Sequence, residues 1–159
     1  MESNVKQAIK EELEATRAEW NELLGGVAAD QWNRLAYSEG SEWRVVDILR
    51  HVADSERGMT ALIVRIQEGG EGVPPDFDLH RWNKRAVEKL GDKGPDELLA
   101  GMTASREALL EVIETLQDED WDKRGRHASL RIMSIEEVCR LIASHEAGHL
   151  AVIREALAA

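Results

Sequence analysis

Residues 134–152 read SIEEVCRLIASHEAGHLAV, and this stretch decides the fold. Ser134 precedes Glu137 by three residues, the spacing of a capping box, so we expect a helix to begin here. The positions that follow recur at alternating spacings of three and four residues, which places them along one stripe of a helix. They are Ile135, Val138, Ile142, His145, His149 and Val152. The stretch therefore predicts a long helix with one buried face that continues almost to the end of the chain.

Three further stretches show the same periodicity. We predict helices over about residues 4–24, over about residues 41–67 with Ser41 as a possible N-cap, and from Pro95 onward, since proline suits the first helical position. Strand signals are nearly absent. The sequence thus predicts an all-α fold, a four-helix bundle made by one domain over residues 1–159.

The connection between the second and third helices is unusually long. It covers about residues 69–94, and long connections are often functional. Its middle, from Leu79 to Leu90, has helical character. We therefore expect a short accessory helix between helices two and three.

The composition limits the partners and the cellular compartment that we expect for the protein. The 159 residues carry a net charge of -11, so nucleic acid and anionic membranes are not expected partners. The single cysteine, Cys139, excludes an internal disulfide, and we expect it to be a buried, inert thiol. No apolar run reaches transmembrane length and no signal peptide is evident, so we expect a cytoplasmic protein.

Two histidines occupy core positions of the last helix. His145 and His149 are four residues apart on the apolar stripe, so their imidazoles project from one face and can share an ion. His51, in the middle of the second helix, can supply a third ligand if these two helices adjoin. Three histidines and an open position are the layout of a catalytic zinc site, and nickel or iron also suits imidazole. His80 and His127 lie in connections, where a solvated histidine is the simpler interpretation.

His145-Glu146-Ala147-Gly148-His149 also matches the short zinc-protease pattern, in which the glutamate deprotonates a zinc-bound water. Such proteases need a third ligand downstream, and only ten residues follow His149. We therefore do not expect a protease. Glu146 stays the candidate catalytic residue, as a base or as a group that orients a ligand, and a solvated helix-face glutamate is the alternative.

The chain resembles a known family in two places. Residues 43–56 read WRVVDILRHVADSE and are similar to the second-helix signature of the DinB/YfiT-like superfamily, in which a tryptophan starts the helix and a histidine eight residues on binds metal. His145 and His149 match the other half of that metal triad. Residues 77–87, FDLHRWNKRAV, resemble members close to the N-terminal domain of mycothiol-dependent maleylpyruvate isomerase. The resemblance spans nearly the whole chain, although the second domain of the full isomerases is missing.

This resemblance implies an up-down-down-up bundle whose second and fourth helices bear the ligands His51, His145 and His149. It also implies zinc or nickel, frequent homodimers, and transferase or isomerase chemistry with a low-molecular-weight thiol. The expected function is thus a thiol-dependent S-transferase or isomerase, with a small-molecule thiol and an electrophile as partners. A hydrolase using metal-bound water and a non-catalytic, stress-related metal-binding bundle are the alternatives.

Other side chains complete the expected site. The carboxylates that could orient a ligand imidazole are Asp47, Asp54, Glu56 and Glu146. The residues that could line the mouth and meet an anionic substrate are Arg81, Trp82, Asn83 and Arg85. Trp43 and Trp121 are expected to be packing residues.

Overall fold

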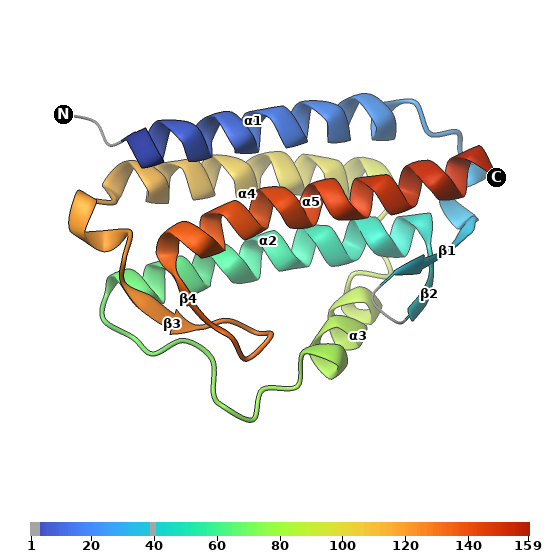
Figure 1. Cartoon of the computed structure of the whole chain (residues 1–159). Helices are drawn as coiled ribbons and strands as arrows, with labels where there is room; N and C mark the ends of the chain where they lie inside the picture. The colour runs from blue at the N-terminus through green and yellow to red at the C-terminus, as the bar shows by residue number, and fades with distance from the viewer. Residues whose placement is uncertain (1–3, 39–40) are drawn as a thin grey trace.

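The computed structural model describes residues 4–38 and 41–159. Four long helices dominate it, joined by short strands, two 3-10 turns and one accessory helix (Figure 1). The elements are α1 (Asn4–Gly25), β1 (Leu35–Ser38), β2 (Ser41–Arg44), α2 (Val45–Gln67), α3 (Leu79–Lys89), α4 (Pro95–Thr115), β3 (Arg124–Arg126), β4 (Ile132–Ser134) and α5 (Ile135–Ala158). The 3-10 turns are η1 (Gln31–Asn33) and η2 (Asp118–Asp120). The predicted all-α four-helix bundle is confirmed, and so is the accessory helix α3.

The order of helix directions is up-down-down-up. In Figure 1, α1 and α5 run one way, and α2 and α4 run the opposite way. The two hydrophobic clusters of the core report the same arrangement. One joins the end of α1 at Trp20 to the starts of α2 at Val45 and α4 at Leu98, and to the end of α5 at Ile153. Because α2 and α4 are parallel, the chain must cross the bundle between them, and α3 lies on that crossing.

A polar layer separates these two hydrophobic clusters. Each long helix contributes one buried charged residue to it: Arg17, Glu56, Arg106 and Glu146, which we call the ion cluster. Arg17 Nη2 lies 2.8 Å from both Glu56 Oε1 and Glu146 Oε2, and Arg106 Nη2 lies 2.8 Å from Glu56 Oε1. The Nη1 group of Arg17 donates to the carbonyl of Met102, and the Nη1 group of Arg106 donates to the carbonyl of Leu13. The charges therefore cancel within the layer, as burial requires.

The structure contains short strands, although the sequence shows almost no strand signal. Two antiparallel hairpins occur, β1–β2 before α2 and β3–β4 before α5. Their strands are three or four residues long, too short to show the alternation that marks a half-buried strand. Ser41 lies in β2, so it does not cap α2 as predicted. That helix begins at Val45, where Asp47 accepts the backbone N–H of Arg44.

The second hairpin is set closely against the end of α2. Gly125 in β3 leaves room only for a hydrogen, because a Cβ there would lie 2.6 Å from Ile66 Cγ1. A single bridge between Gly72 and Arg126 ties the start of the long connection to the same hairpin. The predicted capping box at Ser134 is confirmed, with Ser134 Oγ accepting from the Glu137 amide at 3.1 Å. Among the described helices, none is long and apolar enough to cross a membrane.

Candidate metal centre

Three histidines meet between α2 and α5, which lie side by side in the bundle (Figure 1). His51 Nε2 lies 3.3 Å from His145 Nε2, and His149 Nε2 lies 3.1 Å from the same atom. His51 and His149 are buried, at 2% and 5% exposure, whereas His145 is half-buried. The structure thus brings together all three residues that the sequence predicted as ligands.

The spacing of these nitrogens fits a metal ion. Two ligand nitrogens, each about 2.0–2.1 Å from one ion at a tetrahedral angle, stand about 3.3–3.4 Å apart. His145 Nε2 lies at hydrogen-bonding distance from both other rings, yet one imidazole nitrogen carries either one proton or one lone pair. Two ordinary, unshared hydrogen bonds of opposite direction therefore cannot form at this one atom. A cation that accepts one lone pair from each ring accounts for both short distances.

Helix geometry and one aromatic contact fix the positions of the three imidazole rings. His145 and His149 are one turn apart on α5, and their ring centroids are 4.4 Å apart. His51 packs against Trp43, with ring centroids 5.1 Å apart. Trp43 is therefore a packing residue as predicted, and it packs against one ring of the histidine cluster.

Glu146 lies in the ion cluster, at 1% exposure. Its Oε1 accepts from Thr16 Oγ1 at 2.8 Å, and its Oε2 accepts from Arg17 Nε at 2.9 Å. Glu56, another carboxylate expected near the ligands, is held by Arg17 and Arg106 in the same layer. Both glutamates thus lie on the histidine-bearing helices themselves, where they form the ion pairs of the ion cluster. The catalytic role of Glu146 stays a prediction.

A cavity of about 450 Å³ opens beside the histidines. Its floor is the face of α2 from His51 to Arg65, and its walls are α3, the connection before it, and the loop of the β3–β4 hairpin. His51 and His145 line the cavity, so the site is reached through it. Most of the remaining lining is apolar: Gly58, Met59, Leu62, Val73, Pro74, Phe77, Leu79, Trp82, Ala128, Met133 and Leu141.

The family can now be assigned. The sequence matches the model of the DinB superfamily over residues 12–153. The chain belongs to the DinB superfamily. The predicted resemblance is confirmed. No curated protein sequence matches the chain significantly.

Several solved structures share this DinB fold. YfiT from Bacillus subtilis, described as "a probable metal-dependent hydrolase with an unusual four-helix bundle topology", is 21% identical, with a TM-score of 0.76, over 98% of this chain and 88% of YfiT. Mycothiol-dependent maleylpyruvate isomerase is 17% identical, with a TM-score of 0.74, over 91% of this chain and 60% of the isomerase. The colibactin self-resistance protein ClbS, solved with a dsDNA, is 12% identical, with a TM-score of 0.75, over 97% of this chain and 96% of ClbS. At these identities the likeness concerns the fold.

Sequence reasoning identified part of the cavity wall in this DinB chain. Trp82 and Asn83 line it, as predicted, whereas Arg81 and Arg85 are exposed on α3 away from the lining. The arginines that do line it are Arg65 and Arg131. Arg131 follows a hairpin turn whose placement depends on the pairing of β3 with β4, so no local pattern indicated it.

His127 was set aside as a solvated loop residue, yet it is half-buried and lines the cavity. Burial, followed by the charges of His145 and Arg131, lowers the pKa of His127 below its usual value. The Ser129 amide donates to His127 Nδ1 at 3.0 Å, so the proton of the neutral ring lies on Nε2. The lowered pKa favours the neutral ring of His127, whose Nε2–H can serve as a hydrogen-bond donor.

The two aspartates expected near the ligands have structural partners. Asp54 accepts from Trp82 Nε1 at 3.1 Å, which fixes the indole at the rim of the cavity. Asp47 accepts from Arg44 and Arg50. Burial would raise the pKa of Asp47, but the hydrogen bonds from the two arginines outweigh it and lower that pKa.

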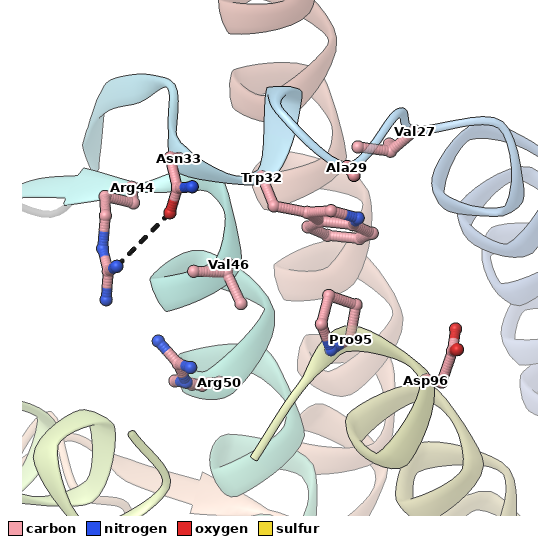
Figure 2. Close-up of a pocket in the computed structure, with 9 residues that line it drawn as sticks. All are labelled: Val27, Ala29, Trp32, Asn33, Arg44, Val46, Arg50, Pro95 and Asp96. Carbon is pink, nitrogen blue, oxygen red and sulfur yellow. Dashed lines mark hydrogen bonds between the residues drawn. The ribbon is translucent and has the colours of Figure 1, made fainter. Parts of the chain in front are cut away.

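A second hollow, of about 490 Å³, lies between η1 and the starts of α2 and α4 (Figure 2). Its two arginines are already engaged. Arg44 donates to Asn33 and Asp47, and Arg50 donates to the carbonyls of Leu90, Gly91 and Lys93. The arginines of this hollow therefore hold the segment before α4 in place, and none of the three histidines lines it.

Proposed function

We propose that this DinB protein is a metal-dependent enzyme that activates a low-molecular-weight thiol for S-transfer or isomerisation. The observation that supports it is the convergence of three imidazole nitrogens from α2 and α5 within 4.8 Å of one another, at the edge of a cavity. His51, His145 and His149 would hold the ion, and zinc or nickel suits three imidazoles. When bound, the ion supplies a lowered thiol pKa, so that a thiolate exists near neutral pH.

The residues of the chain would position the reactants. Met59, Leu62 and the hairpin loop would shield the approach to His145 from water once a ligand fills the cavity. Neutral His127 can donate its Nε2 proton to a polar atom in the cavity. The chain's own thiol does not serve as the nucleophile, because Cys139 is fully buried in the core on α5. We therefore propose an external thiol and an electrophile as the two partners.

A hydrolase is the second candidate, since water could take the place of the thiol at the same ion. The likeness in fold to YfiT favours this reading, because that protein is described as a probable metal-dependent hydrolase. A bundle that binds metal without catalysis is the third. We further propose that the protein is cytoplasmic and a homodimer. Size-exclusion chromatography with light scattering tests the dimer.

Metal content tests the site. We expect the purified protein to bind about one zinc or nickel ion per chain, and the variants His51→Ala and His149→Ala each to lose it. His80→Ala is the matched control, because His80 is an exposed histidine on α3 that does not line the cavity. Unchanged metal content in both site variants would show that the three histidines are not a metal centre.

Thiol dependence separates the candidate reactions. The metal-loaded protein is incubated with an electrophilic substrate series, with and without glutathione, bacillithiol or mycothiol. Turnover only with thiol supports transfer or isomerisation, and turnover without thiol supports the hydrolase. Absence of turnover with every electrophile supports the metal-binding bundle.

A further inference from the structure

We propose that the cavity beside the histidines binds a small organic anion with an apolar body, and that this anion is the electrophilic substrate. Asn83 and the arginines of the cavity would recognise its charged end. This inference rests on the proposed function for its catalytic meaning. The recognition itself depends only on the cavity and is tested below without metal.

Asn83 is the first observation. Asn83 is buried, at 8% exposure, and lines the cavity, and no hydrogen bond joins its side chain to another described residue. The amide atoms of Asn83 are therefore not engaged by another side chain. A ligand in the cavity can accept from the NH₂ group or donate to the oxygen.

The charge of the lining is the second observation. Arg65 and Arg131 line the cavity of a chain whose net charge is -11. Neither forms an ion pair with a described residue within 4.0 Å. The only acidic residue in the lining, Asp54, is engaged by the Trp82 indole. Two arginines, both exposed to solvent, thus contribute to the lining, and a guanidinium group forms strong charge-assisted hydrogen bonds with an anion.

The apolar body is indicated by the remaining wall. Phe77 and Trp82 stack at the rim with ring centroids 5.7 Å apart, and Trp82 is 53% exposed although it is a large aromatic residue. Gly58 lies in the middle of α2 and lines the cavity, and nothing lies within 4 Å of the position its Cβ would take. Glycine is a poorer helix former than alanine at such a position. The space it leaves belongs to the cavity and admits a ring or an alkyl chain.

The test compares two probes of the same shape, 4-phenylbutyrate and the neutral 4-phenylbutan-1-ol. Isothermal titration calorimetry is run on metal-free protein at low salt, so that the carboxylate cannot bind through a metal ion. We expect the carboxylate to bind at least tenfold more tightly than the alcohol. Arg131→Leu should remove most of that difference, and Asn83→Leu should reduce it. Arg85→Leu is the matched control, because it removes an exposed arginine on the outer side of α3.

Filling the cavity gives an independent measurement. Gly58→Phe should weaken both probes at least tenfold. Gly101→Phe is its control, since Gly101 is an exposed helical glycine on α4 with nothing within 4 Å of its Cβ position and no part in the cavity. Circular dichroism and the unfolding midpoint confirm that both variants fold.

Three results would overturn the inference: no binding of 4-phenylbutyrate at millimolar concentration, equal affinities for the two probes, or unchanged binding by Gly58→Phe. The His149→Ala variant separates this inference from the proposed function, because His149 does not line the cavity. Retained carboxylate binding by that variant, together with failure of thiol-dependent turnover by the native protein, would leave the anion site standing without the thiol chemistry.

Discussion

Single residues on α5 meet very different surroundings within three turns. His145 faces the cavity, Glu146 is bonded inside the ion cluster, and Cys139 is fully buried among aliphatic side chains. A helix turns its side chains by about 100° per residue, so neighbours in sequence face different partners. The place of His145 in the histidine cluster and the structural contacts of Glu146 follow from that rotation.

Cys139 gives a prediction at this scale. Burial raises the pKa of its thiol to about 12, so the folded protein holds only about one thiolate in ten thousand molecules at pH 8. We expect 5,5′-dithiobis(2-nitrobenzoate) to leave the native protein unmodified for hours and to label it fully in guanidinium chloride. Absorbance at 412 nm measures both. Rapid labelling of the native protein would contradict the buried position and reopen Cys139 as a nucleophile.

Gly72, which lies in the long connection and bridges to the second hairpin, gives a prediction about how these elements pack. Gly72 has a φ of +91°, and a Cβ there would clash with the backbone N and O of Arg126 in β3. Gly72→Ala should therefore lower the free energy of unfolding by about 2 kcal/mol or more, because neither a left-handed backbone nor a backbone clash relaxes cheaply. Urea denaturation measures the change.

The control for this prediction is Gly101→Ala on α4. That glycine is exposed within the helix and has nothing within 4 Å of its Cβ position, so alanine should stabilise the protein by up to about 1 kcal/mol. Equal effects of the two substitutions would show that the hairpin is not held against the long connection as described.

At the scale of the whole molecule, the ion cluster links all four long helices across the middle of the core. Removing one member leaves the opposite charges buried without compensation. Arg106→Met should cost about 3–5 kcal/mol in the free energy of unfolding, because Glu56 and Glu146 would then share only Arg17. Arg140→Met is the control, since it removes an arginine that pairs with Glu12 and Glu136 at the surface, and should cost at most about 1 kcal/mol.

Replacing the whole cluster distinguishes the cost of an unpaired charge from the value of the ion pairs. The variant Arg17→Met, Glu56→Leu, Arg106→Met, Glu146→Leu should be more stable than Arg106→Met alone, since no unpaired charge of the ion cluster is then left buried. A quadruple variant less stable than the single one would show that the intact pairs contribute a large net stabilisation.

Metal binding should also be visible in the stability of the whole molecule. An ion that binds only the folded state stabilises it by about 2.7 kcal/mol at 100 times its dissociation constant. We expect added Zn²⁺ or Ni²⁺ to raise the unfolding midpoint of the native protein and of His80→Ala, and to leave that of His149→Ala unchanged. Equal shifts in all three proteins would place the stabilising ion elsewhere.

The sequence by itself determined the four long helices, the accessory helix and the placing of His145 and His149 on one face of α5. Periodicity, the Ser134 cap and Pro95 are local signals, and local backbone preference decides helices of this length. The pairing of His51 with them came from family resemblance, and α2–α5 packing brings the rings together.

Tertiary structure alone decided the rest. Arg17 and Arg106 look like surface residues in the sequence, and each is buried only because a glutamate on a facing helix lies opposite it. His127 and Arg131 enter the cavity wall through a hairpin too short to leave a pattern. A periodic sequence states which face of a helix is apolar, but the partner of a charge on its flank depends on which helix packs there.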